Sequence, residues 1–393
     1  MPSTSVFFPA STGAAIRTPV HGRRLRALQA WLAPADVRLD GARPWDITLN
    51  HPDAIGRLAS GDTLAIGDAY VDGLWDCRAL DELTTRLWTS GILGRLGSWR
   101  SHLHQLRALL GNPQQGSRAL AVAERHYDRG NTLYAAMLDA RMIYSCGYWR
   151  EARTLDEAQE AKLDLIARKL ALRPGMRVLD VGCGWGGALA YLAEHYGVTG
   201  VGLTVSREQA RWARRCYGDL PLEFVLSDYR TARPGLFDRV FSVGMFEHVG
   251  NRNHAEYFGR LRDFVAPDGW VLLHTIGSLR ASHAADPWIS RHIFPNSVLP
   301  TAPAITGAVA GRFVIEDWHN FGADYDPTLM AWHRNFSEAW PILRPAYGER
   351  FRRLWQFYLL TCAGFFRARQ GQLWQLVLSP RGIPGGYRAE GIR

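Results

Sequence analysis

Residues 178–187 read Val-Leu-Asp-Val-Gly-Cys-Gly-Trp-Gly-Gly, and this decapeptide decides the fold. Val178 to Val181 is typical of a buried strand, because two valines and a leucine accompany a single aspartate. Three glycines at alternate positions follow, and Ala188 to Tyr196 has the character of a helix. Since glycine lacks a Cβ, such a loop lets a ligand approach the backbone closely. A strand, a glycine-rich loop and a helix in this order predict a nucleotide-binding turn in an α/β protein.

Strands and helices alternate around this loop. Short apolar runs predict the strands, and apolar residues at helical spacing predict the helices between them. The strands are expected at residues 177–181, 198–204, 222–227, 237–243 and 269–275. The clearest helices are expected at Asp156–Leu172, Arg207–Cys216 and His254–Phe264. This βα repetition predicts an α/β protein with a doubly wound, parallel, Rossmann-like sheet.

The last part of the chain departs from the repetition. Apolar runs at Arg312–Trp318 and Leu373–Ser379 predict two more strands, which flank a helical stretch from about residue 327 to 370. We expect these two strands to pair in antiparallel fashion at one end of the sheet.

The length of 393 residues allows two or three domains. Residues 1–20, rich in Ser, Thr, Pro and Ala, are typical of a flexible tail. Residues 21–110 are expected to form a smaller N-terminal α+β domain. Residues 111–118 include Gly-Asn-Pro-Gln-Gln-Gly, which is typical of a linker. Residues 119–393 then carry the α/β domain.

Within the N-terminal unit the pattern is weaker. Short strands are expected at Val37–Leu39 and Ile47–Leu49, and Leu25–Leu32 suggests a short helix. Leu80–Leu96 has apolar residues at helical spacing, although Gly91 and Gly94 are expected to interrupt the pattern near its end.

The chain carries a formal net charge of +9. This charge favours an acidic partner, either nucleic acid or an anionic lipid surface. Composition explains it equally well, since arginine is abundant and Lys162 and Lys169 are the only lysines. The five cysteines include no C-x-x-C pair, so neither a disulfide framework nor a metal site is indicated, and the reduced thiols of the cytosol fit best. No apolar run of about 18 residues or more suggests a membrane span.

The spacing G-x-G-x-G after Asp180 resembles motif I of class I S-adenosylmethionine-dependent methyltransferases. Ligands of such sheets bind at the carboxyl ends of the strands, so the residues at those ends are candidates for the cofactor site. They are Asp180, Gly182, Gly184, Gly186, Thr204, Gln209, Asp228 and Tyr229. No acid ends the second strand, so Thr204 and Gln209 offer neutral hydrogen bonds to the ribose instead. Asp228 is placed to accept from the adenine amino group, although an Asp there is equally typical of a turn.

Polar residues also gather amid apolar neighbours at four other places. These are residues 143–149, 245–249, 272–277 and 317–326. Taken singly, a histidine at a strand end is more often structural than catalytic, and Cys146 would be taken for a small buried hydrophobe.

Taken together, these segments resemble the cyclopropane-fatty-acid synthase family over about residues 60–380. The stretches that carry the resemblance are Gly67–Trp75, His126–Asn131, Tyr144–Trp149, Val178–Gly186, Gly244–Gly250, His274–Gly277, Asp286–Ile289, Asp317–Gly322, Cys362–Arg369 and Gln372–Gln375. The resemblance implies transfer of a methylene group from S-adenosylmethionine to the cis double bond of an acyl chain in a phospholipid. A carbocation forms, and loss of a proton from the new methyl group closes a cyclopropane ring.

The resemblance also implies roles for particular residues. Bound bicarbonate is the expected base, surrounded by Cys146, Glu247, His274 and Tyr325 with the backbone of Ile276. Tyr144 and Ser145 are expected to contact the cofactor. The N-terminal domain would face lipid, and the enzyme would be a homodimer in the cytoplasm, attached peripherally to the inner face of the cytoplasmic membrane. Unsaturated phospholipid is therefore the expected partner, and nucleic acid is not.

Three other functions stay open at this point. A fatty-acyl C-methyltransferase would quench the same cation differently and give a methyl- or methylene-branched chain. A small-molecule N- or O-methyltransferase would need neither so many polar groups around an apolar centre nor the extra domain. A non-enzymatic lipid- or nucleic-acid-binding protein would have no use for both sets of site residues.

Overall fold

The computed structural model describes residues 19–93 and 130–388. Three expected segments therefore lie outside the described residues. They are the linker at 111–118, the stretch His126–Arg129 of the family resemblance, and the tail except for its last two residues. The division between the two domains falls in the same gap.

A seven-stranded sheet forms the centre of the α/β part, in the order β5-β4-β3-β6-β7-β9-β8. The first five strands in this order are parallel, and β9 and β8 run antiparallel to their neighbours. The strands are β3 (Arg177–Val181), β4 (Thr199–Thr204), β5 (Leu222–Leu226), β6 (Phe237–Val243), β7 (Val265–Ser278), β8 (Val314–Asn320) and β9 (Gly371–Ser379). The predicted class I, Rossmann-like fold and the antiparallel pair are confirmed, with β9 inserted between β7 and the edge strand β8.

Helices cover both faces of this sheet. One face packs against α8 (Leu155–Lys169), α9 (Gly187–Tyr196) and α10 (Arg207–Tyr217). The other packs against α11 (His254–Phe264) and α13 (Ala302–Val309). Because side chains alternate along a strand, Leu179 faces α11 and α13 whereas Val178 faces α8. Asp180 is therefore directed to the α8 side, which places its carboxyl group beneath that helix.

The N-terminal unit is mainly helical. It contains α1 (Pro19–Leu32), α2 (Asp53–Leu58), α3 (Thr63–Val71) and α4 (Leu80–Thr89), with a small antiparallel pair of β1 (Thr48–Leu49) and β2 (Trp75–Asp76). The expected strand at Val37–Leu39 is wrong as a strand, because only a single bridge joins Leu39 to Ile47. Helix α4 ends before Gly91, as the interruption in its pattern suggested.

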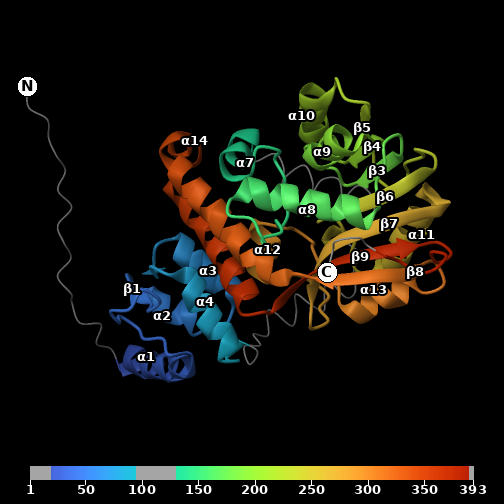
Figure 1. The fold of residues 1–393 in the computed structure, drawn as a ribbon. Helices are drawn as coiled ribbons and strands as arrows, with labels where there is room; N and C mark the ends of the chain where they lie inside the picture. The colour runs from blue at the N-terminus through green and yellow to red at the C-terminus, as the bar shows by residue number, and fades with distance from the viewer. Residues whose placement is uncertain (1–18, 94–129, 389–393) are drawn as a thin grey trace, which may run out of the picture.

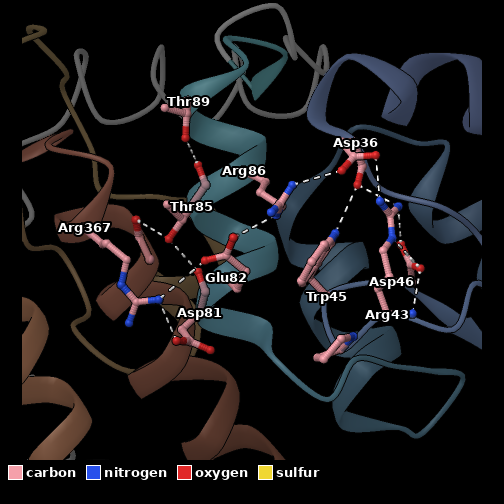
Figure 2. A network of polar contacts seen from close by, with 12 residues as sticks. Asp36, Arg43, Trp45, Asp46, Asp81, Glu82, Thr85, Arg86, Thr89 and Arg367 are labelled. Carbon is pink, nitrogen blue, oxygen red and sulfur yellow. Dashed lines mark hydrogen bonds and ion pairs between the residues drawn. The ribbon is translucent and has the colours of Figure 1, made fainter.

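Helix α14 (Tyr325–Arg367) lies between this unit and the sheet, as Figure 1 shows. It is bent at Gly348, whose φ of 72° is not helical. The helix packs along α3, α4 and α7 (Asn131–Met137), and α12 (Pro287–His292) contacts α3 beside it. Arg367, near the end of α14, donates to Asp81 of α4 at 2.7 Å and joins the polar network of Figure 2.

No helix of the described residues is both long enough and apolar enough to cross a membrane. The five cysteines all lie in the described part of the chain, and each is an unpaired thiol.

Candidate active site

A cavity of about 210 Å³ lies at the carboxyl ends of β3, β4, β5 and β6. Nine of the ten residues expected to bind the cofactor line it. They are Tyr144, Ser145, Asp180, Gly182, Gly184, Thr204, Gln209, Asp228 and Tyr229. Most of the remaining lining is apolar, including Trp185, Leu203 and Met245. The arrangement suits a ligand with a large flat apolar part and a few polar handles.

Gly186, the tenth expected residue, does not line the cavity. It precedes α9 with a φ of 86°, a conformation that glycine adopts without strain. A Cβ at this position would lie 2.7 Å from the ring of Phe224 and 2.9 Å from Ala213. Gly186 therefore lets the strand-to-helix turn pack closely against Phe224 and Ala213. It supports the glycine loop without facing the cavity itself.

Thr204 and Gln209 meet at the end of β4. The Thr204 hydroxyl donates to the Gln209 side-chain oxygen at 2.9 Å, and both side chains are buried at the cavity wall. Ser206 caps α10 by accepting from the Gln209 backbone at 3.3 Å. The cap fixes the start of α10, so that Gln209 returns to the cavity with its amide nitrogen available.

Asp228 is held by Arg230, a residue that the sequence did not single out. The Arg230 guanidinium donates to both carboxylate oxygens, at 3.0 and 3.2 Å from Nε and 2.5 Å from Nη2. Although burial opposes it, the hydrogen bonds from Arg230 keep the pKa of Asp228 below its usual value. Asp228 is therefore an ionised acceptor at the cavity wall, fixed in orientation before any ligand arrives.

The segment before α8 brings two expected residues, Tyr144 and Ser145, to the cavity. Gln159 of α8 donates to the Ser145 carbonyl at 2.7 Å, and Lys162 of α8 donates to the Ser145 hydroxyl at 2.8 Å. Tyr144 donates to or accepts from Tyr358 at 2.9 Å. Lys162 is fully buried and also lines the cavity.

Glu247 lies next to the cavity in a short 3-10 turn after β6. One carboxyl oxygen accepts from the Ile276 backbone at 2.7 Å, and the other, Oε2, is buried without a hydrogen-bond partner among residues 19–93 and 130–388. Burial raises the pKa of Glu247 to about 7, although the hydrogen bond from Ile276 opposes the shift. Near neutral pH this carboxyl group is therefore protonated for part of the time.

His274 of β7 is fully buried and neutral, because burial lowers its pKa well below the usual value. Its Nδ1 contacts the Gln375 side-chain nitrogen at 3.2 Å, and its Nε2 has no partner in the part of the chain that the structure describes. Gln375 stands opposite His274 in the pairing of β9 with β7. If the Gln375 amide donates to Nδ1, the imidazole proton is on Nε2 and is available to a ligand.

Cys146 and Tyr325 complete the second group of expected residues. Both belong to one apolar cluster with Phe321 and Ile276. The Cys146 thiol is fully buried, 3.6 Å from the Thr328 hydroxyl, and burial raises its pKa. Tyr325 stacks on Phe366 with ring centres 4.4 Å apart.

The structure thus brings Cys146, Glu247, His274 and Tyr325 together. Phe321 and Ile276 connect them, since His274 packs edge-on against Phe321 at 5.7 Å and Glu247 is bonded to the Ile276 backbone. The four side chains supply a carboxyl group that is protonated for part of the time near neutral pH, a neutral imidazole, a thiol and a phenol in apolar surroundings. Such groups donate hydrogen bonds to a small anion without adding a charge of their own.

Comparison with known proteins identifies the family of the chain. The family described as mycolic acid cyclopropane synthetase matches residues 114–376. The cyclopropane-fatty-acyl-phospholipid synthase of Escherichia coli (strain K12) is 46% identical over 359 residues, which cover 91% of this chain and 93% of the relative. The chain belongs to the cyclopropane synthase family. It is therefore an S-adenosylmethionine-dependent methyltransferase, as the resemblance predicted.

Two further relatives bear on the fold and the cofactor. A probable fatty acid methyltransferase of Pseudomonas putida is 32% identical and covers 86% of this chain and 90% of that protein. The crystal structure of the mycolic acid cyclopropane synthase CmaA1, complexed with S-adenosylhomocysteine and CTAB, matches with a TM-score of 0.62 and 30% identity. The match covers 66% of this chain and 97% of CmaA1, so about a third of this chain has no counterpart there.

Proposed function

We propose that this enzyme transfers a methylene group from S-adenosylmethionine to the cis double bond of an unsaturated acyl chain in a membrane phospholipid, forming a cyclopropane ring. The observation that carries the proposal is the convergence of Cys146, Glu247, His274 and Tyr325 beside the cavity. A simple methyl transfer to nitrogen or oxygen has no need of these uncharged donors in apolar surroundings.

The cavity binds the methyl donor, S-adenosylmethionine. The ionised Asp228, held by Arg230, accepts from the adenine amino group, and Thr204 and Gln209 bond the ribose. Asp180, Tyr144 and Ser145 contact the amino-acid part. The glycines at 182 and 184 let the backbone approach the cofactor.

The alkene π-bond attacks the sulfonium methyl group, so that a carbon–carbon bond forms as the carbon–sulfur bond breaks. The positive charge then rests on the neighbouring alkene carbon. Tyr325, held flat against Phe366, presents an aromatic face that can stabilise this cation. Loss of a proton from the new methyl group leaves the electron pair that closes the ring.

The second group of residues fits a bicarbonate ion. Two buried polar atoms, Glu247 Oε2 and His274 Nε2, lack partners among the described residues and provide the attachment points that a small anion requires. Bicarbonate, when bound, supplies the base for the proton. Glu247 donates in its protonated form, and His274 donates from Nε2 while Gln375 holds its other nitrogen. The Ile276 backbone orients Glu247.

Substrate access involves the N-terminal unit. The relative from Escherichia coli, which covers 91% of this chain, is named for a phospholipid substrate. The N-terminal unit, which precedes the family match at residues 114–376, is accordingly assigned to the lipid surface, with the chain acting as a homodimer at the inner face of the cytoplasmic membrane. The net charge of +9 supports attraction to anionic lipid.

Incubation with methyl-labelled S-adenosylmethionine and vesicles of monounsaturated phospholipid, followed by mass analysis of the acyl chains, tests the proposal. A gain of CH₂ with loss of the alkene supports it. A methyl-branched or methylene-branched product would instead establish a fatty acid C-methyltransferase, the activity for which the Pseudomonas relative is named. Absence of label from the lipid contradicts both.

Membrane attachment and dimerisation are tested separately. Sedimentation with anionic vesicles and with neutral vesicles should show salt-sensitive binding only to the former. Light scattering of the full chain should give about twice its mass of 44.1 kDa. A monomer, or equal binding to both vesicle types, would contradict the corresponding part of the proposal.

A further inference from the structure

Lys162 occupies an unusual place in this arginine-rich chain. It is one of only two lysines, and its side chain is fully buried in α8, on the face that covers the sheet. Burying an ammonium group is costly unless other groups bond and compensate it. Lys162 lies at the cavity wall and donates to the Ser145 hydroxyl at 2.8 Å. Its neighbours suggest a role for this group.

Acidic groups surround this ammonium. Burial lowers the pKa of Lys162, but Asp139, Cys146 and Asp180 all act in the opposite direction and favour its protonated form. Asp180 lies near the end of β3 on the same side of the sheet; burial raises its pKa to about 8, and Lys162 opposes that shift. Each group thus favours the charged form of the other against the cost of burial, and both have a pKa of about 8.

The Lys162 bond decides the direction of the Ser145 hydroxyl group. A protonated lysine has hydrogens to donate and no lone pair, so Ser145 Oγ must act as the acceptor. The Ser145 carbonyl is held independently by Gln159 at 2.7 Å, so the backbone cannot turn away. Among the described residues, no bond donated by Ser145 Oγ is recorded. The hydroxyl hydrogen is left for a ligand in the cavity.

The layout of the sheet places the amino-acid end of the cofactor here. Asp228 follows β5, which is two strands away from β3 and Asp180, a separation of about 10 Å. With the adenine at Asp228, the amino-acid end reaches Asp180 and Ser145. The acceptor Asp180 suits the ammonium group of that end, and a donor hydroxyl suits its carboxylate.

We propose that Lys162 is a positioning residue for the cofactor, because its ammonium group fixes the Ser145 hydroxyl as a hydrogen-bond donor to the carboxylate of S-adenosylmethionine. The inference rests on the proposed function, since it takes S-adenosylmethionine as the ligand. It assigns Lys162 no contact with the reacting atoms.

Calorimetric binding of two ligands to the full chain tests this role. S-adenosylhomocysteine carries the carboxylate, whereas 5′-methylthioadenosine has the same nucleoside without the amino-acid end. We expect Lys162→Met to weaken S-adenosylhomocysteine binding about tenfold, the loss of one charge-assisted hydrogen bond, and to leave methylthioadenosine binding unchanged. The KM for S-adenosylmethionine should rise by a similar factor, with a smaller change in kcat. Equal weakening of both ligands, or of neither, overturns the proposal.

A matched variant separates this role from general destabilisation. Lys169 lies two turns further along α8, is equally buried and pairs with Asp317 at 3.0 Å. Lys169→Met should lower the unfolding temperature but leave the affinity for S-adenosylhomocysteine unchanged. If it weakens binding as much as Lys162→Met, the effect belongs to the helix and the inference fails.

Ser145→Ala gives a second route that does not depend on folding of the lysine variant. It should weaken S-adenosylhomocysteine about as much as Lys162→Met does, again without affecting methylthioadenosine. The double variant should bind no more weakly than either single variant, because both remove one interaction. Additive losses would show that Lys162 does not act through Ser145. If the wild type binds neither ligand, the proposed function itself fails.

Discussion

At the scale of single residues, His274 is the side chain whose chemistry depends most on its surroundings. Burial keeps it neutral, and its Nε2 has no partner in the described structure. We expect His274→Ala to reduce turnover by about 100-fold or more, because the proposed anion loses a donor in apolar surroundings. Affinity for S-adenosylhomocysteine should stay within a few-fold, since His274 does not line the cofactor cavity. Steady-state kinetics and calorimetry measure the two effects.

His254 provides the control for that variant. It too is a buried histidine with a lowered pKa, but it stacks on Phe246 in the layer formed by α11, on the other face of the sheet. His254→Ala should destabilise the protein and leave the turnover of the folded fraction nearly unchanged. Comparable turnover losses in both variants would mean that His274 is only a packing residue.

Glu247 predicts a pH dependence of turnover. Its pKa of about 7 means that the protonated, donating form prevails below that value and is lost as the pH rises through it. The ionised form repels a bound anion, so wild-type turnover should decline above about pH 7 on this account. Glu247→Gln keeps a donor at every pH and should flatten that limb of the profile. A variant that is inactive throughout would indicate that Glu247 moves a proton instead of donating a hydrogen bond.

At the scale of secondary-structure elements, the turn between β3 and α9 holds the cofactor loop. Gly186→Ala should lower the free energy of unfolding by about 2–4 kcal/mol, because a Cβ there is strained at positive φ and also collides with Phe224 and Ala213. Gly175 has a similar φ of 85° but open space around it, so Gly175→Ala should cost only about 1 kcal/mol. Denaturant titration compares the two. Equal costs would show that packing beneath the loop is unimportant.

The elements that the sequence predicted well are those whose pattern is local. The strands of the sheet begin and end within about four residues of their expected positions, because each is a buried apolar run between turns. The N-terminal unit was less predictable. Its strands are only two residues long, too short to show an apolar period of their own.

The expected site residues do converge, although spacing in the sequence could not have shown their partners. Gln375 meets His274 only because β9 is inserted beside β7, which no local pattern reveals. Arg230 is two residues from Asp228 and could have been noticed as a partner for its carboxylate. Lys162 had a compositional signal, since a rare lysine in a helix that covers the sheet is expected to be buried for a reason.

At the scale of the whole molecule, α14 connects the N-terminal unit to the reacting centre. Arg367 donates to Asp81 of the N-terminal unit at 2.7 Å and to both carboxylate oxygens of Asp326 at 2.9 and 3.0 Å. Asp326 adjoins Tyr325, and Phe366, next to Arg367, stacks on the Tyr325 ring. The Arg367 guanidinium group thus joins the N-terminal unit to α14 and also fixes Asp326, which is next to the proposed active-site residue Tyr325.

Two variants separate these roles of Arg367. Asp81→Asn removes the charge of the contact between the units and leaves Asp326 paired, so it should lower the free energy of unfolding by about 1 kcal/mol or less, because the pair is partly exposed, and keep turnover within about twofold. Arg367→Met also leaves the Asp326 carboxylate unpaired, so the loss should be about 1–3 kcal/mol. Turnover should then fall about tenfold, because Asp326, the residue next to Tyr325, is no longer held in place by Arg367. If Asp81→Asn lowers turnover as much as Arg367→Met while both remain folded, the contact between the units, and not the hold on Asp326, controls the active site.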